Sequence, residues 1–345
     1  MNLLRSGGIR HPGGYGEAMD PDVLTLAGTD VTVPRLGVGT WSWGDESTWG
    51  MGGYDAGLTQ DSIRDAWDAS LDAGVTLFDT AEVYGGGESE RIIGSLLAGD
   101  RDRAARAIIA TKFMPSPWKL DIRRALLRSL RASLDRLGLD AVDLYQIHGP
   151  VSLRSHTALA GALAAAHDQG LIRAIGVSNY SIKVTRAMAA ALGRHGLRLA
   201  TNQIEFSLLR RSPETSGLLA ACADLGVVPL AYSPIGQGRL TGKYSVANPP
   251  PGKRNFSDHP MEVVDAVVAE LRRIRDAHDG RSPSQVALNW IIAKGALPIP
   301  GAKNRHQAEE NAGALGWSLD DDVARLDRAA LPGIRNLASR VWQHG

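Results

Sequence analysis

The sequence predicts an α/β fold in which eight parallel strands alternate with helices and close into a barrel. Short apolar runs alternate with stretches of helical periodicity along the 345 residues, and continuous apolar strands of this kind are typical of a parallel sheet covered by helices. An open doubly wound sheet would carry a G-x-G-x-x-G fingerprint after its first strand, but GVGTWSWG at 37–44 lacks that spacing. We therefore expect a single (β/α)8 TIM barrel domain over residues 21–345.

The elements are expected in the following order. An N-terminal hairpin is expected in VLTLAGTDVTVP, where apolar residues alternate around a Gly-Thr-Asp turn at 28–30, and it would cover one end of the barrel. The strands are expected at 35–41, 75–80, 107–113, 142–148, 172–179, 199–206, 227–234 and 296–302. The helices are expected at 61–74, 89–99, 121–138, 155–170, 181–196, 213–226, 261–278, 282–295 and 304–316. Five of these end in LDAG, DRLG, HDQG, RHG and ADLG, and such a glycine suits the left-handed position after a helix.

Two long loops interrupt this alternation. The loop after the first strand, at 42–60, is rich in glycine, and three tryptophans lie at its start or within it (Trp41, Trp43 and Trp49), so we expect it to form a wall of a pocket. The loop after the seventh strand, at 235–260, contains glycines, prolines and basic side chains. Loops of this length in compact domains are usually functional. We expect the second loop to act as a lid over a bound cofactor.

Composition indicates an ordinary globular protein, with 43% hydrophobic and 22% charged residues. A net charge of +1 gives no electrostatic reason to expect nucleic acid or an anionic membrane surface as a partner. The single cysteine, Cys222, excludes an internal disulfide framework, is expected in a helix core and favours a reducing, cytoplasmic location. No apolar run reaches the 18 residues of a membrane span. Residues 1–20 are expected to form a flexible leader; a targeting segment is disfavoured by the acidic Glu17 and Asp20.

Four ionisable residues lie where the second, third and fourth strand runs end. They are Asp79 in VTLFDT, Tyr84 in the following AEVYG, Lys112 in AIIATKF and His148 in AVDLYQIH. Because the carboxyl ends of barrel strands converge on one face, we expect the four side chains to meet in one pocket. Only seven of the 38 basic residues are lysines, so a lysine inside an apolar strand is a specific signal.

These four groups fit the delivery of a proton to a carbonyl oxygen. The phenol of Tyr84 has an ordinary pKa of about 10, so it is a weak acid at neutral pH unless a nearby cation lowers that value. Lys112 is the expected cation, and the carboxylate of Asp79 would keep it charged. His148 would orient the substrate oxygen or feed a proton relay. The alternative is a structural Lys–Asp pair with an unrelated tyrosine and histidine, since structural ion pairs also perturb pKa values.

Motifs for other chemistries are missing from the sequence. It contains no H-E-x-x-H or C-x-x-C, and its nine histidines are scattered, so we expect no metal site. The stretch from Gly176 to Tyr180 fails the G-x-S-x-G pattern of a hydrolase nucleophile at its last position. No phosphate-binding Walker loop is present either.

Seven strings occur in an order that resembles the aldo-keto reductase superfamily, and look most like its plant-plastid and cyanobacterial branch with bacterial relatives. They are FDTAEVYG, ATKF, LYQIH, GVSNY, NQIEFS, AYSPIGQGRLTGKY and IPGAKNRHQAEENAGALGW, and the similarity runs from about residue 25 to residue 327. Each string alone is a weak signal, but the ordered set is highly specific.

The resemblance implies that Asp79, Tyr84, Lys112 and His148 form the catalytic tetrad, with Tyr84 as the general acid. It also implies hydride transfer from NADPH bound across the barrel mouth. The residues that match the nicotinamide site are Ser178, Asn179, Gln203 and Tyr232, and those that match the pyrophosphate loop are Ser233, Pro234, Ile235, Gly236, Gly238, Leu240, Gly242 and Lys243. The residues that match the adenosine site are Gly301, Ala302, Lys303, Arg305, Gln307, Glu310 and Asn311.

Some of these assignments have structural alternatives. Lys303 and Arg305 suit a 2′-phosphate, which favours NADP over NAD, but a solvated helix start would also carry them. Tyr232 would also suit a core aromatic position. Gln203 lies in an apolar strand and needs a partner for its amide.

The substrate is expected to be an aldehyde or ketone, reduced to an alcohol. Gly149 follows His148 where many family members have a large residue, so we expect a wider pocket at that wall. Trp41, Trp43 and Trp118 are the candidate lining residues. The resemblance also allows a pyridoxal reductase or, from a different class, a nucleotide-binding regulatory subunit with little turnover. The sequence leaves the oligomeric state open.

Overall fold

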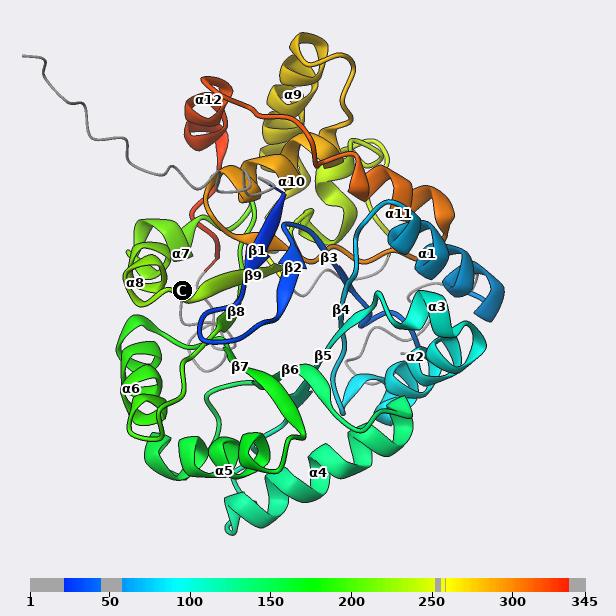
Figure 1. Cartoon of the computed structure of the whole chain (residues 1–345). Coiled ribbons are helices and arrows are strands. Elements are labelled where there is room, and N and C mark those ends of the chain that lie inside the picture. The colour runs from blue at the N-terminus through cyan, green and yellow to red at the C-terminus, as the bar shows by residue number, and fades with distance from the viewer. Residues whose placement is uncertain (1–21, 45–57, 252–255, 258, 335–345) are drawn as a thin grey trace, which may run out of the picture.

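The computed structural model describes residues 22–44, 58–251, 256–257 and 259–334, and shows an eight-stranded parallel sheet that closes into a barrel (Figure 1). The strands follow one another in chain order around the sheet. They are β3 (Gly37–Gly39), β4 (Leu77–Asp79), β5 (Ile108–Phe113), β6 (Val142–Ile147), β7 (Ile172–Ser178), β8 (Thr201–Glu205), β9 (Val228–Tyr232) and β10 (Leu297–Pro298). The predicted (β/α)8 TIM barrel is confirmed.

The barrel closes where β3 meets the chain just after β10. Gly39 forms a parallel bridge with Gly301, and its amide donates to the carbonyl oxygen of Pro300 at 2.9 Å. A Cβ atom on Gly39 would lie 2.8 Å from the carbonyl oxygen of Ile299. A glycine is needed here because the two backbones approach too closely for any side chain.

Helices form an outer ring around the sheet in Figure 1. They are α1 (Gln60–Asp72), α2 (Glu88–Gly99), α3 (Arg101–Ala104), α4 (Ile122–Leu137), α5 (His156–Asp168), α6 (Ile182–Gly193), α7 (Ser212–Thr215), α8 (Leu218–Leu225), α9 (Met261–Ala277), α10 (Pro283–Ala293), α11 (Arg305–Ala312) and α12 (Asp322–Ala329). Their apolar faces and the outer face of the sheet form the larger hydrophobic core.

Helix α4 shows how the local sequence defines these helices. The Asp121 carboxylate caps its first turn by accepting from the backbone amide of Arg124 at 3.1 Å. Apolar residues recur at helical spacing on one buried face, at Leu126, Leu130, Leu134 and Leu137. Gly138 ends the helix in the left-handed conformation with φ 67°. The glycines that close three other predicted endings, at 74, 170 and 226, also have positive φ, so the prediction is confirmed at these helices. Gly196 has positive φ as well, but α6 already ends at Gly193.

The N-terminal hairpin is confirmed and covers the amino end of the barrel. Its strands, β1 (Val23–Thr25) and β2 (Thr32–Pro34), pair antiparallel. Leu26, Val31 and Val33 from the hairpin belong to a second apolar cluster that fills this end. The strand residues in that cluster are Leu77, Ala110, Leu144, Ala174, Leu230 and Leu297.

The structure corrects the predicted helices in two places. The helix predicted over 213–226 is broken into α7 and α8, because Gly217 adopts φ 84° and begins a new helix. Helices α3 and α12 were not predicted: α3 has only four residues, and α12 lies beyond the last recognised repeat unit. The loop after the seventh strand contains a short 3-10 segment, η2 (Gly236–Thr241).

Several predictions fall on residues outside the described part of the chain. These are the leader at 1–20, Trp49 with most of the loop after the first strand, and residues 252–255 and 258 of the proposed lid. Cys222 is fully buried, as predicted for a helix core, and burial raises the pKa of its thiol to about 12. None of the described helices combines the length and the apolar character needed to cross a membrane.

Candidate active site

The four candidate catalytic residues come from three neighbouring strand ends. Asp79 is the last residue of β4, Lys112 lies near the end of β5, and His148 directly follows β6. Tyr84 begins η1 (Tyr84–Gly87), the turn after β4. The structure therefore brings the predicted residues together at the carboxyl end of the barrel, opposite the hairpin.

The amine of Lys112 is the centre of this group. Its Nζ donates to Asp79 Oδ1, to the carbonyl oxygen of Thr80 at 2.8 Å and to the phenolic oxygen of Tyr84 at 3.2 Å. Lys112 is fully buried and Asp79 is 2% exposed. Burying a charged amine is unfavourable unless its hydrogen bonds are made. Here the three contacts use its three donors.

The second oxygen of Asp79 is held by two side-chain amides. Gln146 Nε2 and Gln203 Nε2 each donate to Asp79 Oδ2 at 2.8 Å. Gln146 lies on β6 and is fully buried. It is not among the site residues predicted from the sequence, although an amide between Tyr145 and Ile147 of an apolar strand is the same signal as Gln203.

His148 faces Tyr84 across the site. Their ring centroids are 5.6 Å apart with an interplanar angle of 80°. Burial and then the positive charge of Lys112 lower the pKa of His148 well below its ordinary value. The imidazole is therefore neutral at physiological pH, so it suits a hydrogen-bonding role toward a carbonyl oxygen and does not suit proton storage.

The pKa of Tyr84 differs from the sequence expectation. Burial raises the pKa of the phenol, and the positive charge of Lys112 offsets this only in part. Burial also opposes the charge of Lys112, but Asp79 and Tyr84 together raise the pKa of the amine above its ordinary value. The site therefore holds a neutral phenol beside a permanent cation. The cation lowers the cost of forming a phenolate without creating one at rest.

The predicted nicotinamide residues Ser178, Gln203 and Tyr232 lie on β7, β8 and β9, and Asn179 directly follows β7. The Ser178 hydroxyl donates to the carbonyl oxygen of Gln203 at 3.0 Å, and the Asn179 amide nitrogen of the backbone donates to the same oxygen at 2.7 Å. The Tyr232 hydroxyl donates to Asn179 Oδ1 at 3.0 Å. The side-chain amide of Gln203 points at Asp79, so this residue links the catalytic group to the predicted cofactor residues.

The predicted pyrophosphate loop follows β9 and contains unusual backbone conformations. Ser233 and Gln237 have positive φ, as does Asn179 nearby. Positive φ is uncommon outside glycine, and such strain concentrates at functional sites. The loop continues through Pro234, Ile235, Gly236, Gly238, Gly242 and the exposed Lys243. Leu240 is fully buried in the main core, so its side chain faces the protein interior.

The predicted adenosine residues run from the loop after β10 into α11. The backbone amide of Lys303 donates to Gln307 Oε1 at 3.0 Å, and Asn311 Nδ2 donates to the carbonyl oxygen of Gly301 at 3.2 Å. Arg305 begins α11 and is exposed. The remaining members are the buried Ala302 and the half-buried Glu310.

The three predicted lining tryptophans have different environments. Trp43 is fully buried, packs near Phe78 and donates through Nε1 to the carbonyl oxygen of Ala302 at 2.8 Å. It supports the adenosine segment from inside the protein. Trp41 is half-buried, and Trp118 is 78% exposed in the loop before α4.

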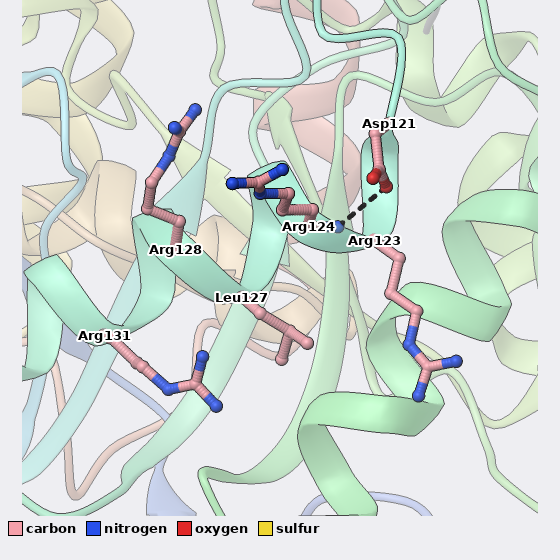
Figure 2. Close-up of a pocket in the computed structure, with 6 residues that line it drawn as sticks. All are labelled: Asp121, Arg123, Arg124, Leu127, Arg128 and Arg131. Atoms are coloured by element: carbon pink, nitrogen blue, oxygen red, sulfur yellow. Dashed lines mark hydrogen bonds between the residues drawn. The ribbon is translucent and has the colours of Figure 1, made fainter.

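A separate hollow lies on the outer ring, on α4 (Figure 2). It is lined by Asp121, Arg123, Arg124, Leu127, Arg128 and Arg131. Within the described residues, no ion pair joins these four arginines to a carboxylate; Arg131 donates to the neutral Gln169 at 2.7 Å. The hollow contains none of the four candidate catalytic residues.

Sequence comparison finds related proteins over most of the chain. A profile of the Aldo/keto reductase family matches residues 35–330. The chloroplastic pyridoxal reductase of Arabidopsis thaliana is 34% identical over 328 residues, covering 91% of this chain and 87% of the relative.

Solved structures agree over the same extent. A glycerol dehydrogenase from Gluconobacter oxydans superposes with a TM-score of 0.77 at 28% identity, covering 92% of this chain and 99% of that one. An aldo-keto reductase from Klebsiella pneumoniae in complex with NADPH has a TM-score of 0.71 at 27% identity, covering 92% of this chain and 98% of that one. With a family match that spans all eight strands and the four candidate catalytic residues, the chain belongs to the aldo/keto reductase family and is an oxidoreductase.

Proposed function

We propose that this protein reduces an aldehyde or ketone to an alcohol with NADPH, with Tyr84 as the proton donor. The observation that carries the proposal is the contact of the Lys112 amine with both Asp79 and the Tyr84 hydroxyl. NADPH is supported by the Klebsiella pneumoniae relative, which was solved in complex with it.

Each of the four residues has a distinct role in the proposed reaction. The carbonyl carbon would receive its hydride from NADPH when the cofactor is bound. Tyr84 gives its phenolic proton to the carbonyl oxygen, which becomes strongly basic as the hydride arrives. Lys112 stabilises the negative charge left on Tyr84, and Asp79 keeps Lys112 in place. His148, being neutral, donates a hydrogen bond to the same carbonyl oxygen.

The donor set around the site fits a dinucleotide. Ser178, Asn179, Gln203 and Tyr232 supply hydroxyl and amide groups and an aromatic ring for the nicotinamide half. Gly236, Gly238 and Gly242 have positive φ and carry no side chain. The backbone amides of the loop after β9 can therefore come close to a pyrophosphate. Lys303 and Arg305 at the start of α11 supply cations for a 2′-phosphate.

Pyridoxal is the substrate that we would test first. The chloroplastic pyridoxal reductase of Arabidopsis thaliana is 34% identical to this chain, and Gly149 beside His148 leaves room for an aromatic ring. We propose Trp41 and Trp118 as contacts for a bound ring, while the burial of Trp43 assigns it to supporting the cofactor segment.

A tyrosine pair tests the proton donor. Tyr84→Phe should lower kcat for NADPH oxidation with 4-nitrobenzaldehyde or pyridoxal by on the order of 10³-fold, because the proton source is removed. Tyr145→Phe is the matched control, since the Tyr145 hydroxyl is buried and has no hydrogen-bond partner among the described residues. A Tyr84→Phe enzyme with wild-type kcat would show that Tyr84 is not the donor. Tight NADPH binding with negligible turnover of every carbonyl by the wild-type protein would instead favour the regulatory alternative.

A further inference from the structure

Two amides share one oxygen of Asp79, and one of them, that of Gln203, belongs to the predicted nicotinamide site. Gln146 and Gln203 each donate to Oδ2 at 2.8 Å. Gln203 sits beside Ser178 and Asn179, which both hydrogen-bond its carbonyl oxygen. Gln146 is fully buried in the barrel interior.

We infer that Gln146 is a positioning residue that holds Asp79 while Gln203 turns to the nicotinamide carboxamide of the cofactor. The inference rests on the NADPH binding proposed above. Without cofactor, both amides satisfy Oδ2. When Gln203 leaves to bind the carboxamide, Gln146 remains as the donor, and the carboxylate keeps a hydrogen bond on each of its oxygens.

The barrel makes room for this arrangement with a glycine. In the parallel register, Lys112 on β5, Gln146 on β6, Gly176 on β7 and Thr201 on β8 form one row across the sheet. A Cβ atom on Gly176 would lie 2.8 Å from Gln146 Cγ and 2.2 Å from Thr201 Oγ1. Any larger residue at 176 would push Gln146 away from Asp79, so the two positions act together.

The burial of the Asp79 carboxylate explains why Oδ2 needs Gln146 as a second hydrogen-bond donor beside Gln203. An ionised oxygen that is buried without hydrogen-bond donors pays the full desolvation penalty, because neither water nor the protein stabilises its charge. If Gln203 were the sole donor, its departure would leave Oδ2 without a partner. The cofactor would then have to compete with Asp79 for Gln203, and NADPH would bind more weakly.

Calorimetric titration of the full-length protein with two ligands tests this inference. Gln146→Leu should weaken NADPH binding about tenfold, the loss of one hydrogen bond to a charged group. Adenosine 2′,5′-bisphosphate carries the adenosine half without the nicotinamide, so its affinity should stay within twofold of wild type. Equal weakening of both ligands would show general damage to the site, and an unchanged NADPH affinity would show that Gln146 does not hold Asp79 for Gln203. Either result would overturn the inference.

Two further variants sharpen the experiment. Thr201→Val lies in the same row, and its hydroxyl has no hydrogen-bond partner in the described part of the chain, so it should leave the affinity for both ligands unchanged. Gln203→Leu should weaken NADPH binding, and adding Gln146→Leu should then weaken it no further, because no glutamine remains to be released. Failure of the wild-type protein to bind NADPH at all would count against the proposed function instead.

Discussion

The two ends of the barrel interior are built from the same alternating strand pattern but from different chemistry. Leu77, Ala110 and Leu144 belong to the apolar cluster under the hairpin. Two residues further along the same strands come Asp79, Lys112 and Gln146. Successive side chains of a strand alternate between faces, so residues two apart both point into the barrel.

The amino end of this barrel therefore contributes to stability, and the carboxyl end holds the candidate catalytic residues. The apolar hairpin side chains of Leu26, Val31 and Val33 fill the amino end, whereas the carboxyl end buries a charged pair that costs free energy unless every partner is present. A change at the amino end should therefore lower stability and leave the reaction intact. A change at the carboxyl end should affect both.

The largest effect is expected from Lys112→Met. It leaves Asp79 buried without its cation, which should lower the free energy of unfolding by about 3–5 kcal/mol and lower kcat by on the order of 10³-fold. Urea unfolding and NADPH oxidation measure the two effects. The double variant Lys112→Met with Asp79→Leu should recover much of the stability and none of the activity. Stability near wild type in the single variant would mean that the pair is not energetically coupled.

A smaller and purely structural effect is expected at the hairpin end. Leu26 is 1% exposed within the apolar cluster, so Leu26→Ala should lower the free energy of unfolding by about 3 kcal/mol through lost burial and a cavity. At a temperature where the variant remains folded, its kcat and its KM for NADPH should equal those of the wild type. A large fall in kcat would show that the two ends are not independent.

The smallest effect is a pH dependence that comes from His148. Its folded-state pKa is well below the ordinary 6.5 because of burial and the Lys112 charge, so the unfolded chain takes up the proton first as pH falls. The stability that comes from this depressed pKa is fully present above pH 6.5 and decreases below it, by at most ~1.4 kcal/mol per pH unit. Urea unfolding at pH 7, 6 and 5 should give a shallower loss for His148→Gln than for wild type. Parallel curves would contradict the buried neutral imidazole.

Local sequence patterns were enough to predict the repeating framework and the main catalytic candidates. Strand and helix periodicity is a local property, so the eight strand units and the left-handed glycines after the helices could be recognised from short stretches. Asp79, Lys112 and His148 could be recognised because barrel topology sends every strand end to one face.

The contacts between these groups depend on how distant parts of the chain fold together. The partners of Asp79 Oδ2, Gln146 and Gln203, lie 67 and 124 residues away along the chain, and no local pattern states that their amides meet on one oxygen. The contact of Trp43 with Ala302 also joins residues that are far apart in the sequence, so no local pattern predicts it. The raised pKa of Tyr84 also depends on packing, because the balance between burial and the Lys112 charge is set by side chains that come together only in the closed barrel.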